Sequence, residues 1–203
     1  MVVNEQLPKI AYLILGMLSA GHDSGYAITR TANRSTRFFW AASDGQVYPQ
    51  LRKLAEAGLI EGSEEARGAR SRTSYRLTPA GRRALDEWLT SEEIPSYELR
   101  DEGLLRLFFA DELSVAQLRA QVDLISRRHE HVAWRLREIE PRVGRPASLL
   151  TLRLGLALQN WVADWYAQLA QRLADEDPDA RAADVLESVL AEHPAPLQTH
   201  SGE

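Results

Sequence analysis

The chain has 203 residues, enough for one or two ordinary domains, and its 44% hydrophobic and 26% charged residues are typical of a globular protein. It contains no cysteine, which excludes a disulfide framework and a metal site built on thiolates. We recognise no apolar run long enough to span a bilayer and no cleavable signal peptide, so we expect a cytoplasmic protein without a membrane partner.

The formal charge of −5 is distributed unevenly along the chain. Through Arg83 there are 12 Lys and Arg residues against 7 Asp and Glu, whereas the remainder has 12 against 22. A basic first part followed by an acidic second part predicts that only the first part faces a polyanion. Nearly all the basic residues are arginine, which fits paired contacts to phosphate or guanine, although GC-rich coding would have the same effect.

Two helices are predicted at the start of the chain. Residues 1–6 are expected to be frayed, and residues 7–18 are apolar nearly all round, which predicts a buried first helix. After a turn, Ser24 or Asp23 can cap a second helix over residues 25–33. We expect the irregular stretch that follows to pack its aromatic side chains in the core beneath the helices. These aromatic residues are Phe38, Phe39 and Trp40.

A third helix is predicted over residues 44–57. Ser43 is suited to cap it, because its hydroxyl can accept a hydrogen bond from a free amide of the first turn, and Gly58 is suited to end it. Pro49 lies close enough to the start for its missing amide proton to cost little. The apolar residues have near-helical spacing. They are Val47, Leu51, Leu54 and Ala55.

A hairpin is predicted directly after the third helix. Residues 59–60 lead into a polar strand, residues 67–70 supply a basic turn, and residues 73–77 return with alternating polarity. A helix followed at once by a two-stranded ribbon with a basic tip is the outline of a winged helix-turn-helix. A further helix, opened by a Thr-Pro pair, is predicted over residues 78–89.

The predicted fold class is mainly α. We expect an N-terminal winged helix-turn-helix domain, with three helices and a two-stranded β-wing, followed by an all-α domain. The winged domain would span residues 1–90, a polar linker residues 91–99, the helical domain residues 100–192 and a disordered tail residues 193–203. Within the helical domain, helices are predicted over residues 100–110, 114–140, 146–175 and 180–192.

The two long helices of the second domain indicate assembly. Each would be about 40 Å long and carries an apolar stripe that small neighbouring elements cannot cover. An antiparallel pair that meets its symmetry mate would bury both stripes, so we predict a homodimer. One stripe contains Leu118, Val122, Ile125, His129, Val132 and Leu136; the other contains Leu150, Leu154, Leu158, Trp161, Trp165 and Leu169.

Three runs of the sequence resemble the PadR family of transcriptional regulators, namely residues 12–28, 38–60 and 71–89. The most specific element is GQVYPQLRKLAEAGLI, residues 45–60, which places a Tyr-Pro pair inside the recognition helix and leads directly to a glycine. The resemblance covers about residues 8–90 well and the remainder only in pattern and length. Family members often begin the second helix with His-Gly-Tyr-Glu. Here Ser24 and Ala27 flank the Gly-Tyr pair, so the roles of that histidine and glutamate are not carried over.

The recognition helix supplies the candidate contacts to bases. In a winged helix its N-terminal part faces base edges in the major groove. Gln46 and Gln50 can pair with adenine, and Val47, if it is not buried, can contact a thymine methyl. The resemblance implies that Tyr48 contacts DNA through its hydroxyl, and the alternative is a ring packed under the wing. Lys53 fits either a phosphate contact or a solvated charge.

Two further regions are candidate contacts to the DNA backbone. Ser24 and Tyr26 lie at a helix N-terminus, where free amides and the helix dipole attract a phosphate. The arginines of the wing tip fit a phosphate or minor-groove contact, and a flexible solvated hairpin is the alternative. The complete predicted set is Ser24, Tyr26, Ser43, Gln46, Val47, Tyr48, Gln50, Lys53, Arg67, Arg70 and Arg72.

The helical domain offers candidate residues for sensing a small molecule. Trp161 and Trp165 are four residues apart on one helix face, where they can form an aromatic wall for a flat ligand, with His129 as a further candidate. The alternative is that both tryptophans belong to a dimer core. The resemblance implies release from DNA by an aromatic or lipophilic effector, whose identity the sequence does not specify. We predict neither a cofactor nor a metal site.

An enzyme is not expected. The chain has no cysteine nucleophile, no glycine-rich phosphate loop after a strand and no metalloprotease spacing of His and Glu. We therefore predict a homodimeric DNA-binding regulator, most simply a repressor, that binds an inverted repeat in double-stranded DNA and is released by a small molecule. Two alternatives stay open: a transcriptional activator, and a winged-helix module that docks a protein. Steep salt dependence would distinguish DNA binding from protein docking.

Overall fold

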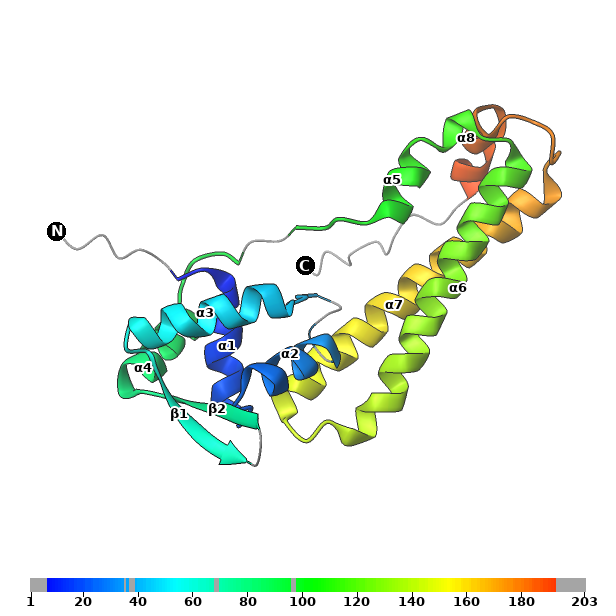
Figure 1. Cartoon of the computed structure of the whole chain (residues 1–203). Helices are drawn as coiled ribbons and strands as arrows, with labels where there is room; N and C mark the ends of the chain where they lie inside the picture. The colour runs from blue at the N-terminus through cyan, green and yellow to red at the C-terminus, as the bar shows by residue number, and fades with distance from the viewer. Residues whose placement is uncertain (1–6, 35, 37–38, 68–69, 96–97, 193–203) are drawn as a thin grey trace, which may run out of the picture. The chain divides into compact units, whose positions relative to one another are not determined.

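The computed structural model describes residues 7–34, 36, 39–67, 70–95 and 98–192 (Figure 1). The chain divides into two compact units, Met1–Ser96 and Tyr97–Glu203, and each is described by itself. The mainly α class with a two-stranded wing is confirmed. Within the described residues, no helix combines the length and the apolar character that crossing a membrane requires.

The first unit is built on three helices, a hairpin and a fourth helix. Their order is α1 (Lys9–Ser19), α2 (Gly25–Arg34), α3 (Asp44–Glu56), β1 (Ile60–Arg67), β2 (Arg70–Leu77) and α4 (Pro79–Leu89). Helix α1 packs against α3 and α4, and α2 packs against α3. The core is aliphatic, and its most deeply buried side chains include Ile14, Leu15, Ile28, Val47, Leu51 and Leu54.

The start and end of α3 follow from local chemistry, as the sequence predicts. The backbone N–H of Ser43 donates to Oε1 of Gln46 at 3.1 Å, so that the two residues form a capping box. After the helix, Gly58 adopts a φ of +67°, in the left-handed region that favours glycine. The N–H of Leu59 then donates to the carbonyl of Leu54 at 2.9 Å. These contacts set the direction in which the chain enters the wing.

The wing is an antiparallel hairpin that is hydrogen-bonded to the turn before α2. Its register runs from Ile60 opposite Leu77 to Arg67 opposite Arg70, with the turn between them outside the described residues. The N–H of Tyr75 donates to the carbonyl of Asp23 at 2.6 Å, which joins β2 to the turn before α2. The wing is therefore placed beside α2 by backbone contacts.

The prediction that the aromatic residues before α3 lie in the core is wrong for Phe39 and Trp40, which are 62% and 40% exposed. Phe38 lies outside the described residues. The hydroxyl of Thr36 donates to the carbonyl of Trp40 at 2.9 Å, in a tight turn that precedes α3. The buried core of this unit includes Ala32 and Ala42, whereas Phe39 and Trp40 remain exposed.

The second unit is a long helical hairpin with two shorter helices at one end. It consists of α5 (Glu102–Phe108), α6 (Val115–Ile139), α7 (Pro146–Arg172) and α8 (Ala182–Glu192), with 3-10 turns at Ala110–Glu112, Glu140–Arg142 and Leu173–Asp175. Helices α6 and α7 lie side by side and antiparallel (Figure 1). Helix α8 begins two residues later than predicted, because Arg181 forms a β-bridge with Ser114.

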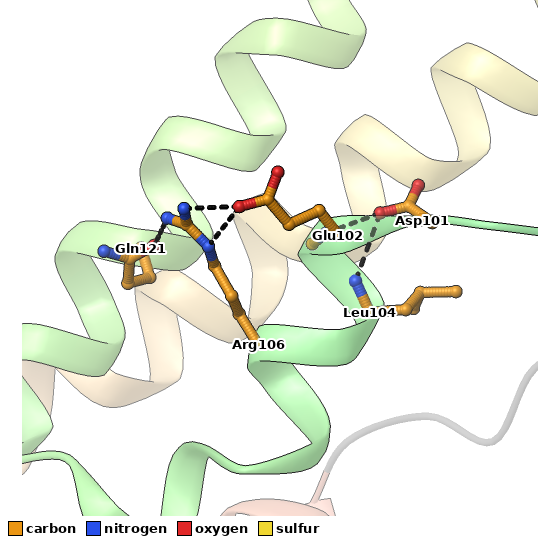
Figure 2. A network of polar contacts seen from close by, with 6 residues as sticks. Asp101, Glu102, Leu104, Arg106 and Gln121 are labelled. Carbon is orange, nitrogen blue, oxygen red and sulfur yellow. Dashed lines mark hydrogen bonds and ion pairs between the residues drawn. The ribbon is translucent and has the colours of Figure 1, made fainter.

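A polar network fixes α5 to α6 (Figure 2). The carboxylate of Asp101 accepts from the N–H groups of Gly103 at 2.7 Å and Leu104 at 3.1 Å, which caps α5. The guanidinium of Arg106 donates to Glu102 at 2.6 Å and to Oε1 of Gln121 on α6 at 3.2 Å. The predicted helix over 100–110 is thus shorter, since Asp101 is its cap.

Of the two predicted apolar stripes, the one on α6 is largely buried and the one on α7 is partly exposed. On α6, Leu118, Val122 and Leu136 are buried within the single chain, so the expectation that this stripe requires a second copy is wrong. The partners are α7 and α8 of the same unit. On α7, by contrast, the stripe is exposed over its first four members. They are Leu150, Leu154, Leu158 and Trp161, with exposures of 72%, 62%, 52% and 45%.

Candidate nucleic-acid interface

Helix α3 has an inward and an outward face, and two predicted DNA contacts lie on the inward one. The side chain of Val47 is 0% exposed and that of Gln50 is 8% exposed, so both belong to the packing of the unit. A contact of Val47 with a thymine methyl was predicted only if the residue is not buried, and that condition is not met; the burial of Gln50 likewise speaks against its reading of adenine. The physical reason is the helical period, which places both residues on the side that carries Leu51 and Leu54.

The other predicted residues lie at exposed positions of α3, with Tyr48 on the flank toward α2 and Gln46 and Lys53 on the opposite flank. Ser43, Gln46, Tyr48 and Lys53 are all exposed. The oxygen of Gln46 accepts from the N–H of Ser43 at 3.1 Å and from its hydroxyl at 3.2 Å, so the amide nitrogen is the group that Gln46 presents outward. Both residues thereby stabilise the first turn of α3.

A hollow opens between α2, α3 and β2. Tyr26, Arg30 and Arg34 line it from α2, Tyr48 from α3 and Tyr75 from β2. Guanidinium groups and phenol hydroxyls donate hydrogen bonds to phosphate oxygens, and aromatic rings pack on sugars and bases. The hollow thus has the chemistry of a surface for a nucleic-acid backbone.

Arg30 and Arg34 are not among the residues predicted from the sequence. A signal for them was present, since Tyr26, Arg30 and Arg34 follow one another at intervals of four and therefore share a helix face. Because Tyr26 is a predicted DNA contact, this spacing makes both arginines candidates for the same surface. The structure places that shared face in the hollow.

The predicted residues at the start of α2 differ in their placement. Ser24 is buried, and its Oγ accepts from the N–H of Ala27 at 3.3 Å, so its side chain caps the helix. Tyr26 is exposed. At the wing, the strand register places the backbones of Arg67 and Arg70 next to the turn. The side chains of Arg67, Arg70 and Arg72 lie outside the described part of the structure.

The predicted ligand residues of the second unit are brought together only in part. Nδ1 of His129 and Oε1 of Gln159 are hydrogen-bonded at 2.6 Å, and the imidazole stacks with the Tyr166 ring at a centroid distance of 6.4 Å. Trp165 meets the same tyrosine edge-on at 5.1 Å. Trp161 instead belongs to the exposed stripe of α7. The rings of His129 and Trp165 therefore both contact Tyr166, whereas Trp161 is exposed.

Comparison with known proteins places both units. Residues 14–87 match the Transcriptional regulator PadR-like family, and residues 99–174 match the Virulence activator alpha C-term family. The chain is 34% identical over 106 residues to the Negative transcriptional regulator PadR of Bacillus subtilis (strain 168). That alignment covers 52% of this chain and 58% of the Bacillus protein.

Solved structures share the fold over most of the chain. Bacillus subtilis PadR in complex with operator DNA has a TM-score of 0.76 at 24% identity, covering 82% of this chain and 99% of that one. The same protein in complex with p-coumaric acid has a TM-score of 0.70 at 24% identity, covering 83% and 100%. The Vibrio cholerae virulence activator AphA has a TM-score of 0.62 at 29% identity, covering 81% and 98%.

The helices and the two-stranded wing of the first unit define a winged helix-turn-helix fold. The first unit contains a domain that matches the PadR-like family of transcriptional regulators over residues 14–87, where the chain is also similar to the Bacillus regulator. The description of this family is that of transcriptional regulators. The predicted resemblance is thus confirmed, and the second unit has a family match of its own.

Proposed function

We propose that the chain is a repressor that binds an inverted-repeat operator as a homodimer and is released by a small molecule. The observation that carries the proposal is the juxtaposition of the outward face of α3 with the hollow that Tyr26, Arg30, Arg34 and Tyr48 line. If α3 entered the major groove, the side chains that line this hollow would lie beside α3, where they could contact the phosphates. Negative regulation is supported by the likeness to the Bacillus regulator.

The homodimer is supported by the exposed stripe of α7. Four large apolar side chains spaced by three and four residues are costly to leave in water, and a second copy supplies an identical surface. Two recognition helices held at a fixed distance would fit an inverted repeat, whose half-sites are separated by a helical turn of DNA. Dimerisation and operator symmetry are therefore one proposal.

Release by a ligand requires two dimer geometries with different affinities for that ligand. We place the ligand in the second unit, near His129, Trp161 and Trp165. The complex of Bacillus PadR with p-coumaric acid supports a planar aromatic ligand for the fold. In a variant that retains only Trp161 and Trp165 of the five tryptophans, a ligand that releases DNA should change the fluorescence. Unchanged fluorescence would rule out this placement.

Fluorescence anisotropy tests DNA binding directly. The wild type is titrated, at two salt concentrations, into DNA from upstream of its own gene and into a random duplex of equal length. We expect preference for the upstream DNA and a steep loss of affinity with salt. Arg30→Ala should make the slope of log K against log salt shallower by about 0.9, the value for one lost phosphate contact.

Arg119→Ala is the matched control, because this exposed arginine lies on α6 in the other unit. It should leave the slope unchanged. Equal slopes in Arg30→Ala and the wild type would remove Arg30 from the interface. Weak binding of every duplex, without salt dependence, would favour a winged-helix module that docks a protein.

Activation is the second candidate function, and one observation favours it. The second unit matches a family named for a virulence activator, and AphA shares the fold at 29% identity. A reporter gene behind the bound DNA separates the two. Higher expression after deletion of the regulator supports repression, and lower expression supports activation.

A further inference from the structure

We propose that Gly25 is a positioning residue for Tyr48, and that it acts by leaving room for the tyrosine ring on the first turn of α2. This inference rests on the proposed DNA-binding function, because its consequence is measured as DNA affinity. A Cβ atom at position 25 would lie 2.6 Å from Cε1 and 2.9 Å from Cζ of Tyr48. Non-bonded carbons are separated by about 3.5–4.0 Å at their optimum, so even an alanine side chain overlaps the ring.

The backbone conformation at position 25 does not require a glycine. The glycines with positive φ in the described residues are Gly21, at +90°, and Gly58, at +67°, where the left-handed region favours this residue. Gly25 is the first residue of α2 and has no such value. Other residues with ordinary helical φ can begin a helix. What position 25 requires is therefore space for Tyr48.

The helix is held more firmly than the ring. The carbonyl of Ser24 accepts from the N–H of Ile28 at 2.9 Å, and its Oγ accepts from the N–H of Ala27 at 3.3 Å. Tyr75 on β2 donates its N–H to Asp23 at 2.6 Å, just before α2. The ring of Tyr48, by contrast, is the end of a side chain that is 43% exposed. An alanine at position 25 would therefore displace the ring into solvent and leave the helix in place.

Gly81 shows the opposite situation. A Cβ there would meet the backbone carbonyl of Leu59, which has no side-chain freedom to yield. Gly16, on α1, has nothing within 4 Å of such an atom. The three glycines thus separate overlap with a functional side chain, overlap with the backbone, and no steric overlap. Gly16→Ala is the matched control for Gly25→Ala.

The displacement matters because Cζ carries the hydroxyl of Tyr48. A hydrogen bond to a phosphate tolerates little change in donor position, since its strength falls steeply with distance and angle. Loss of one bond to a charged group reduces affinity by about tenfold or more. We therefore expect Gly25→Ala to weaken DNA binding by about the same factor as Tyr48→Ala, at unchanged thermal stability.

A double-mutant cycle tests the inference on the full-length chain. Wild type, Gly25→Ala, Tyr48→Ala, the double variant and Gly16→Ala are titrated against a duplex that the wild type selects from random-sequence DNA. If Gly25 acts through Tyr48, the double variant binds no more weakly than Tyr48→Ala alone. Losses that multiply in the double variant, or an unchanged affinity in Gly25→Ala beside a weakened Tyr48→Ala, would overturn the proposal.

The ring itself is observed without DNA, by NMR of protein labelled in its tyrosine rings. The Tyr48 resonances, assigned with Tyr48→Phe, should shift in Gly25→Ala and stay in place in Gly16→Ala. Unmoved resonances overturn the positioning role, whatever the DNA affinities. If the resonances move but the wild type selects no duplex, the contact between Gly25 and Tyr48 holds and the proposed DNA-binding function fails.

Discussion

At the residue scale, the hydroxyl of Tyr166 is buried in the core around α6 and α7, without a hydrogen-bond partner among the described residues. A buried donor without a partner costs free energy that a phenylalanine would not. We expect Tyr166→Phe to leave the free energy of unfolding unchanged or to raise it by up to about 1 kcal/mol. Thermal and urea unfolding measure the change.

The exposed Tyr26 provides the control for this substitution. Tyr26→Phe should not change the stability, since its hydroxyl is in contact with water. A loss of more than about 1 kcal/mol in Tyr166→Phe would mean that the hydroxyl makes a hydrogen bond in solution.

The same tyrosine predicts a dependence on alkaline pH. Burial, and then the nearby carboxylate of Asp101, raise the pKa of Tyr166 above its ordinary value near 10. The folded state therefore retains the phenol proton more strongly than the unfolded state does. The associated stability is fully present below pH 10 and is lost as the pH rises through the folded pKa. Unfolding measured from pH 8 upwards should show a steeper alkaline loss in the wild type than in Tyr166→Phe.

At the scale of elements, Thr78 joins the turn after α3 to the start of α4. Its Oγ1 donates to the carbonyl of Gly58 at 2.7 Å and accepts from the N–H of Gly81 at 3.0 Å. Thr78→Ala removes both a helix cap and a contact that spans 20 residues of sequence. We expect it to lower the free energy of unfolding by about 1–2 kcal/mol, measured in urea.

Thr90→Ala is the comparison, because the hydroxyl of Thr90 donates to Asp86 within the same helix end. Thr90→Ala should lower the free energy of unfolding by only about a few tenths of a kcal/mol. Equal losses in the two variants would show that the contact between the turn after α3 and α4 contributes nothing beyond an ordinary local hydrogen bond.

At the scale of the whole molecule, the exposed stripe of α7 predicts how the homodimer is broken. Leu154→Asp places a carboxylate in the proposed interface twice, once in each copy. Because burial of a leucine contributes about 1.5–3 kcal/mol, the dimer dissociation constant should rise by at least about 100-fold. Sedimentation equilibrium measures it, and operator affinity should fall in parallel.

Leu190→Asp, on α8, tests whether a carboxylate at any exposed leucine would dissociate the dimer. Leu190 is as exposed as Leu154 but lies outside the stripe. The Leu190→Asp substitution should leave the dimer intact. A dimer that survives Leu154→Asp would place the interface elsewhere on the chain and remove the support that the stripe gives to an inverted-repeat operator.

Local sequence signals determined the elements of the chain. The capping residues Ser43 and Ser114, the glycine at position 58 and the Thr-Pro pair before α4 act within one turn, so their effects were predicted from neighbouring residues. The alternation of β2 and the tyrosine-proline pair of α3 likewise led to the winged fold and to its family. Dimerisation, the effector and the DNA contacts stay predictions, because they depend on molecules other than this chain.

Tertiary structure alone decided which side chains face outward and which lie together. Val47 and Gln50 have suitable chemistry for bases, yet packing against the core buries them. Phe39 and Trp40 are apolar, yet a tight turn leaves them exposed. Tyr48 meets Gly25 across 23 positions of sequence, a contact that no local pattern records. Periodicity gives the faces of a helix, but contacts between distant segments determine which face is covered.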